Sequence, residues 1–178
     1  MSTPLYIRQE TQEDRSYVFK LIEAAFKNIE HTDHKEQFLV ERLRKSQAFI
    51  PELSLVAELE KKIVGYILLS KIKIRNEAAE FDSLAVAPVA VLPEYQNRGI
   101  GGLLLTKSHE RARALEFKSA VLLGHADYYP RFGYKEAASF DIKLPFDVPS
   151  ENCMAIELVE QGLSGVTGTV QYPQEFFG

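Results

Sequence analysis

Three glycines stand at the start of a predicted helix, in the segment QNRGIGG at residues 96–102. Glycine weakens a helix interior by about 1 kcal/mol relative to alanine, so Gly99, Gly101 and Gly102 need another reason to be there. The first amides of a helix have no partner within the helix, and the helix dipole adds partial positive charge at that end. Glycines let an anion approach those amides where a Cβ would obstruct it. The segment therefore predicts a site for a diphosphate.

Close packing is the competing explanation, because the same glycines could simply let the helix approach its neighbouring strand. Two other phosphate motifs can be tested directly. The pattern G-x-x-x-x-G-K-[ST] does not occur in the chain, and Leu104 stands where the third glycine of G-x-G-x-x-G would fall. A P-loop nucleotide hydrolase and a dinucleotide-binding domain are therefore both disfavoured.

A strand and a helix must position these glycines. The apolar, β-branched run FDSLAVAPVAVL at 81–92 predicts a central strand. Pro88 conflicts with that strand, because proline cannot donate to a sheet ladder, and we interpret it as a bulge or a splayed edge. Residues 100–117 predict a helix, and its inner face carries Leu104, Ser108, Ala112 and Leu115.

The rest of the chain alternates between strand and helix patterns. We expect strands at 5–9, 119–124, 136–142 and 153–159. The segment 53–74 predicts two strands joined by a turn at 60–62. Thr11 with Asp14 resembles a capping box before a first helix, whose buried stripe contains Val18, Leu21, Ile22, Ala25 and Phe26. A second helix is expected at 33–45 with Phe38, Leu39 and Leu43 inward, and a short helical turn at 126–132. This order predicts an α/β (α+β) fold with a single domain over residues 1–178.

Composition excludes several classes of protein. With 178 residues, 46% hydrophobic residues and a formal net charge of -4, the chain is typical of a globular protein and not of a general nucleic-acid binder. Cys153 is the single cysteine and lies in an apolar strand, so we interpret it as a core residue. The polar start of the chain has neither a signal peptide nor a membrane span, and we expect a cytoplasmic protein. His31 and His34 are one helical turn apart, but no cysteine or acidic cluster completes a metal site, so we expect no metal.

Two segments carry a family resemblance. LPEYQNRGIGG at 92–102 resembles the Q/R-x-x-G-x-G/A signature of the GNAT superfamily (GCN5-related N-acetyltransferases), which are acetyl-CoA-dependent acyltransferases. YYPRFGY at 128–134 resembles the Y-x-x-x-G-F/Y element after the fifth strand of that family, with Tyr129 four residues before Gly133. The resemblance implies a GNAT-like fold: a mixed, mostly antiparallel central sheet with splayed fourth and fifth strands, flanked by helices. A glycine commonly ends the family's helix where this chain has Glu116, so Glu116 must adopt a left-handed conformation or the helix must be capped differently.

The resemblance also implies acetyl-CoA as co-substrate. Its pantetheine arm would lie in the gap between the splayed strands and pair with backbone groups of Val89, Ala90 and Val91. Its diphosphate would be held by the turn at 96–102. There Gln96 and Asn97 would line the site, and the amides would come from Arg98, Gly99, Ile100, Gly101 and Gly102.

Tyr129 matches the position that family members use as a general acid. A phenol can hand a proton to the thiolate that leaves when an amine attacks the thioester. Tyr128 is interpreted as a packing residue, although a one-residue shift in the match to the family motif would exchange the roles of Tyr128 and Tyr129. The oxyanion would meet a backbone amide near Val91. The base stays open among residues near strand ends, which are Glu94, Asp82, His125 and Asp127.

The function implied is transfer of an acetyl group to a primary amine by direct attack on the thioester. The acceptor would be a small-molecule amine or a protein amino group, with no nucleic-acid or membrane partner, and the chain would be a monomer or homodimer. Two alternatives stay open from the residues alone. One is a non-catalytic module that binds or senses acetyl-CoA, and the other is a purely structural α/β domain.

Overall fold

A long central strand, β3 (Lys62–Arg75), lies in a sheet that has nine strands among the residues that the structure describes. The computed structural model describes residues 3–30 and 32–178, so His31 lies outside the described residues. Two strands pair with one edge of β3, first β2 (Ser54–Leu59) and then the short β9 (Gly168–Gln171). The strand β1 (Leu5–Gln9) pairs with the outer edge of β2. The other edge of β3 pairs antiparallel with β4 (Glu80–Val91) for nearly its whole length.

The sheet continues beyond β4 through one parallel contact. β5 (Ser119–Leu123) meets β4 at the single pair Ala85↔Val121, and β8 (Cys153–Glu157) then pairs antiparallel with β5. The two-residue strands β6 (Lys135–Glu136) and β7 (Ile142–Lys143) pair with β8 and β9. Because β4 runs on to Val91 without a further β5 partner, the two strands part. The predicted sheet, mostly antiparallel with splayed fourth and fifth strands, is confirmed.

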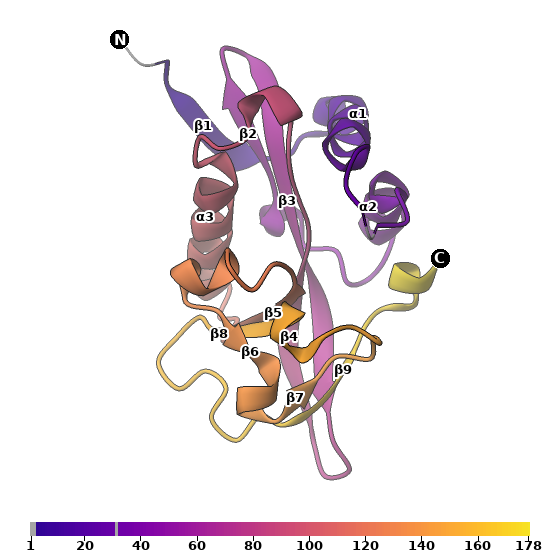
Figure 1. Ribbon diagram of the computed structural model, residues 1–178, viewed down its shortest axis with the longest axis vertical. Helices are drawn as coiled ribbons and strands as arrows, with labels where there is room; N and C mark the ends of the chain where they lie inside the picture. Colours follow the sequence, from indigo (N-terminus) through magenta and orange to yellow (C-terminus); the bar gives the residue numbers. More distant parts are fainter. Residues whose placement is uncertain (1–2, 31) are drawn as a thin grey trace.

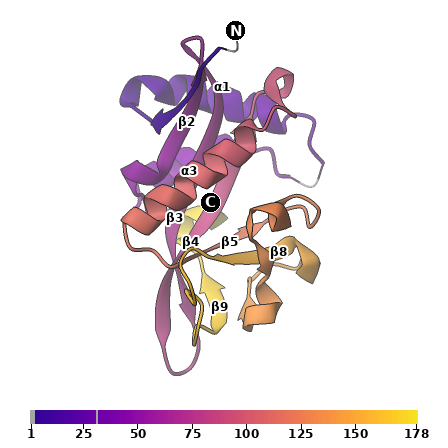
Figure 2. The same cartoon turned by 90° about the vertical axis from the view of Figure 1, so that its left-hand side faces the viewer.

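Helices cover both faces of the sheet (Figures 1 and 2). The helix α3 (Ile100–Ala114) lies on one face, and α1 (Arg15–Phe26) and α2 (Glu36–Arg44) lie on the other. Alternation along β3 sends Ile67 and Leu69 into the core under α3, and Tyr66 and Leu68 into the core under α1 and α2. A third apolar cluster fills the C-terminal part of the sheet. The site elements are thus mounted on a sheet that is buried on both sides.

Several local predictions are confirmed. The register between β3 and β4 shifts where Ile67 pairs with Val89 and Leu69 with Val86, so the bulge expected at Pro88 is present. The amide and hydroxyl of Thr11 both donate to the Asp14 carboxylate. Glu116 has a φ of 69°, which is the left-handed conformation expected as one of two ways to end the helix.

Two predictions about helix faces are wrong. Phe38 is 44% exposed and packs edge-on against Phe19 at the surface, because α2 begins at Glu36 and turns Gln37, Val40 and Leu43 inward. The helix expected to reach residue 117 ends at Ala114, so Leu115 caps it and is exposed rather than on its inner face.

The predicted strand at 136–142 is also wrong. After β6 the chain forms a 3-10 turn (Ala137–Phe140), and Asp141 is left-handed before β7 begins. The Ser139 hydroxyl donates to the Glu136 carbonyl, a local bond that competes with strand pairing. The predicted strand at 153–159 ends at Glu157. The strand β9 was not predicted, since its four residues have no strong pattern and are ordered by the edge of β3.

A buried ion pair fixes α2 to the sheet. Arg44 on α2 donates through Nε and Nη2 to the two carboxylate oxygens of Glu10, and both side chains are almost fully buried. The Ser54 hydroxyl donates to the Glu10 carboxylate and also hydrogen-bonds the Tyr66 hydroxyl, which extends the network into the sheet. Burial raises the pKa of Tyr66, so its phenol is neutral.

We expect Arg44→Met to lower the free energy of unfolding by about 3–5 kcal/mol, because it leaves the Glu10 carboxylate buried and unpaired. Urea unfolding followed by circular dichroism measures the change. The double variant Glu10→Leu with Arg44→Met should recover most of the loss, since it removes both charges. A loss below about 1 kcal/mol in the single variant, typical of exposed pairs, would mean that this ion pair does not hold α2 in place.

Candidate active site

The turn before α3 has the backbone of an anion site. Asn97 and Gly99 are both left-handed, with φ of 63° and 81°, and Gly99 caps the helix. Glycine, and to a lesser degree asparagine, adopt this conformation at low cost. The Leu103 amide is the one that donates back to the Gly99 carbonyl. The amides of residues 100–102 precede it, so they lie in the turn where a helix leaves its donors free.

Side chains stabilise this turn and add positive charge beside it. The Gln96 side-chain amide donates to the Val91 carbonyl at 3.0 Å, which ties the turn to the end of β4. The Arg98 guanidinium lies over the Tyr95 ring at 5.2 Å from its centre, and the Lys62 ammonium lies over the same ring at 5.4 Å. Arg98, which belongs to the turn itself, is the cation that adds positive charge there, whereas Lys62 also pairs with Glu94.

The glycines of the turn have different reasons for being there. A Cβ on Gly102 would lie 2.9 Å from Cζ of Phe132, so this glycine is required for packing. A Cβ on Gly101 would lie 3.2 Å from the Tyr128 hydroxyl oxygen, and one on Gly99 would meet open space. Both explanations of the glycines thus apply: Gly102 lets the helix pack closely, whereas Gly99 shapes the turn.

Alternate residues of β4 point their backbone N–H and C=O groups away from β3. The Leu92 amide donates to the Val64 carbonyl of β3. Since backbone groups alternate in direction along a strand, those of Ala90 also face β3, and those of Val89 and Val91 face the gap left by β5. Of the three β4 residues expected to pair with pantetheine, Val89 and Val91 present their backbone to the gap, and Ala90 does not.

Tyr129 begins the helical turn η4 (Tyr129–Phe132) that follows β5. Its ring packs edge-on against Tyr128 and Tyr134, with centroids 5.0 and 5.8 Å away. A Cβ on Gly124 would lie 2.2 Å from the Tyr129 ring, so any side chain at this position would displace the ring. Burial, with a smaller contribution from Tyr128, raises the pKa of Tyr129 to about 12. The phenol is therefore protonated at neutral pH, as an acid must be.

Tyr128 links the two motifs. Its ring packs on Phe132 and under the Arg131 guanidinium, as a packing residue would. Its hydroxyl, however, reaches the first turn of α3 beside Gly101. Sequence reasoning missed this second role, and the only signal for it was the doubled tyrosine before the proline.

The four candidate bases lie in different places. His125 is exposed after the end of β5, and its carbonyl accepts the amides of Tyr128 and Tyr129. It therefore begins the segment 125–134, which we call the tyrosine turn. Asp127 lies in the same turn, with its carbonyl near Arg131. Asp82 pairs with Lys73 near the start of β4, away from the turn before α3.

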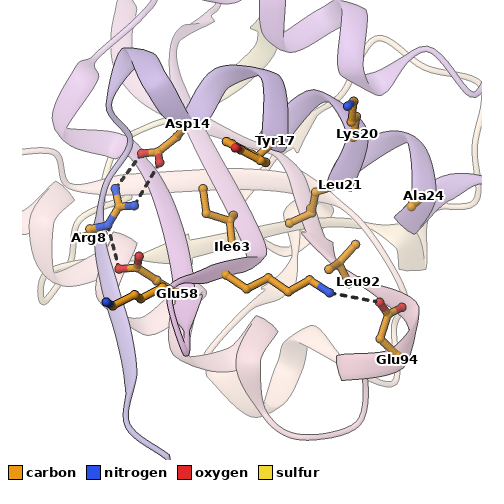
Figure 3. A pocket seen from close by; sticks show the side chains of 12 residues that line it. Arg8, Asp14, Tyr17, Lys20, Leu21, Ala24, Glu58, Ile63, Leu92 and Glu94 are labelled. Atoms are coloured by element: carbon orange, nitrogen blue, oxygen red, sulfur yellow. Dashed lines mark hydrogen bonds and ion pairs between the residues drawn. The ribbon is translucent and has the colours of Figure 1, made fainter.

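Glu94 faces a cavity on the other side of the sheet (Figure 3). This cavity of about 540 Å³ lies between α1 and the β2–β3 hairpin, and its apolar side chains include Leu21 and Ile63 of the core under α1. The Glu94 carboxylate is 3.9 Å from the Lys62 ammonium and largely exposed. Tyr129 packs on the core under α3 instead.

Neither a metal-binding cluster nor a membrane-spanning helix occurs in residues 3–30 and 32–178. No group of three or more His, Cys, Asp or Glu side chains there could hold a metal ion, and His34 bonds the Phe26 carbonyl through Nδ1. None of the helices in that part of the chain has the length and apolar character needed to cross a membrane.

Known proteins resemble this chain in sequence and in fold. The profile of the acetyltransferase (GNAT) domain matches residues 51–136. An uncharacterized N-acetyltransferase of Escherichia coli K12, YjhQ, is 37% identical over 119 residues, which span 66% of this chain and 66% of YjhQ. A GNAT family acetyltransferase from Brucella melitensis, solved with acetyl-CoA, is 30% identical and has a TM-score of 0.80, covering 98% of this chain and 99% of its own. YhbS of Escherichia coli, solved with CoA, shares the fold with a TM-score of 0.89 at 24% identity, over 100% of this chain and 94% of its own.

We expect Gly124→Ala to displace the Tyr129 ring, because the added methyl would overlap it. Overpacking of this kind costs about 1–3 kcal/mol of stability, and the displaced phenol should titrate closer to the ordinary pKa of about 10. Thermal unfolding and the tyrosinate absorbance during an alkaline titration measure the two effects. Leu123→Ala, at the exposed neighbouring position, is the control. An unchanged titration in Gly124→Ala would contradict the tight fit of the ring.

Proposed function

The chain belongs to the GNAT family of N-acetyltransferases, and on that premise we propose that it transfers an acetyl group from acetyl-CoA to a primary amine. One observation carries the proposal most directly. The tyrosine turn meets the first turn of α3, since the Tyr128 hydroxyl lies beside Gly101 and Phe132 lies against Gly102. A proton donor, a turn with free amides and an open strand edge are thereby gathered around the gap between β4 and β5.

Binding of acetyl-CoA follows from these groups. The amides of residues 98–102 would take the diphosphate, with Arg98 adding charge and with Gln96 and Asn97 shaping the turn. The pantetheine arm would pair with the backbone of Val89 and Val91 on the free edge of β4, as an added strand pairs with a sheet edge. The complex of the related Brucella melitensis enzyme with acetyl-CoA supports this assignment.

Transfer requires one bond to form and one to break. The amine nitrogen attacks the thioester carbonyl carbon, and the amide of Val91 would stabilise the oxyanion. When the carbon–sulfur bond breaks, Tyr129 gives its proton to the thiolate, and the amine proton leaves to a base or to water. Among the candidate bases, the placement favours His125 and Asp127, which precede Tyr129 in the same turn. The acceptor is a small-molecule amine or a protein amino group.

We expect Tyr129→Phe to lower kcat about 100-fold or more, the usual contribution of a positioned acid. The assay measures free thiol released from acetyl-CoA with a panel of polyamines, aminoglycosides, amino acids and peptide amines. Acetyl-CoA binding, measured by calorimetry, should change little, because the ring is retained. Binding without thiol release from any acceptor in the unsubstituted protein would instead identify a non-catalytic acetyl-CoA-binding module.

Gly101→Val should abolish acetyl-CoA binding, because its side chain would fill the space between the free amides and the Tyr128 hydroxyl. Leu103→Ala is the matched control, since Leu103 lies on the same helix and is 49% exposed. Calorimetry with acetyl-CoA measures both variants, and circular dichroism checks that both fold. Retained affinity in a folded Gly101→Val protein would refute the diphosphate site.

A further inference from the structure

Behind Tyr129 lies a buried pair of side chains that the transfer step does not use. His109 on α3 is 4% exposed and Tyr134 is 2% exposed. Nε2 of His109 and the Tyr134 hydroxyl oxygen are 2.8 Å apart, which is a hydrogen bond. The two rings are inclined at 46° with centroids 5.5 Å apart.

The pair is neutral. Burial, together with the nearby charge of Arg113, lowers the pKa of His109 to about 4. Burial also raises the pKa of Tyr134, so the phenol keeps its proton. Burying an imidazole or a phenol without a hydrogen-bond partner costs free energy of folding. Each is the partner of the other here, so the bond fixes where both rings can lie.

Tyr134 carries this constraint to Tyr129. The two tyrosine rings pack edge to face, with an interplanar angle of 76° and a centroid distance of 5.8 Å. Gly124 and Tyr128 close the other sides of the Tyr129 ring. The ring therefore rests on Tyr134, whose own position is set by a bond from α3.

The same helix begins at the free amides of the anion site. His109 lies on α3, and residues 100–102 form its first turn. We propose that His109 and Tyr134 are positioning residues, which fix the ring of Tyr129 relative to the helix whose first turn holds the diphosphate. The distance from the Tyr129 hydroxyl to the thioester sulfur is thereby set by one rigid element. The role of this distance rests on the proposed function, whereas the placement of the ring does not.

A hydrogen bond suits this task better than apolar packing alone. A phenylalanine at position 134 would keep the edge-to-face contact but could slide or rotate against α3. The bond to Nε2 weakens steeply when its angle departs from linearity. It therefore restrains the direction of the Tyr134 ring as well as its distance from the helix.

Kinetics of four variants test the inference. Tyr134→Phe and His109→Leu remove the bond, and His109→Gln replaces Nε2 with an amide of similar reach. Ser108→Ala is the matched control, because its buried hydroxyl donates to the Leu105 carbonyl of its own helix. We expect kcat for thiol release to fall about 10- to 100-fold in the first two, with KM for acetyl-CoA within about threefold, as misplacement of a reacting group predicts. His109→Gln should restore most of kcat.

The ring of Tyr129 gives a readout that needs no turnover. Its aromatic signals in carbon–proton correlation spectra, assigned with Tyr129→Phe, should shift or broaden in Tyr134→Phe and His109→Leu and stay unchanged in Ser108→Ala. Unchanged signals in both variants would overturn the inference, whatever the kinetics. If the unsubstituted protein releases no thiol with any acceptor, the proposed function fails, and the spectra still decide the positioning role. If His109→Leu does not fold, Tyr134→Phe, which removes one oxygen atom, decides alone.

Discussion

The separation of β4 from β5 is the constraint on which the rest of the site depends. A continued parallel ladder would consume the backbone groups of Val89 and Val91, and no edge would be left for a ligand. The chain prevents this with a bulge at residues 87–88 and a single backbone pair, Ala85↔Val121. The sheet stays intact despite this gap because β3 pairs with β4 along nearly its whole length, and because β8 pairs with the outer edge of β5.

The two motifs that flank this gap depend on each other. The glycines of the turn before α3 make room for the aromatic side chains of the tyrosine turn, and Gly102 in particular makes room for Phe132. The tyrosine turn in return packs against the same helix through His109 and Tyr134. The helix that begins at the free amides therefore also supports Tyr129, the proposed proton donor. This mutual packing explains why the motifs occur together in one chain.

Local patterns predicted most of the elements but not their exposed and buried faces in every case. The hairpin at 60–62, the strand at 81–92 and the start of α3 follow from residue types that leave few alternatives. Phe38 and the segment 136–142 were predicted wrongly, because an apolar or alternating pattern does not say which neighbour will cover it. The strand β9 needed the edge of β3, which is far away in the sequence.

The sequence by itself determined the two short motifs, because glycines, prolines and tyrosines at fixed spacing impose local backbone geometry. The resemblance of these motifs to the GNAT family then implied the splayed sheet. It also named Tyr129 and the turn at 96–102 as the residues to consider. Only the tertiary structure decided that the Ala90 backbone faces β3, that Glu94 lines the cavity beside α1, and that the Tyr128 hydroxyl reaches α3. The His109–Tyr134 bond joins residues 25 positions apart. Such contacts depend on how helices and strands pack, and no local pattern in the chain encodes them.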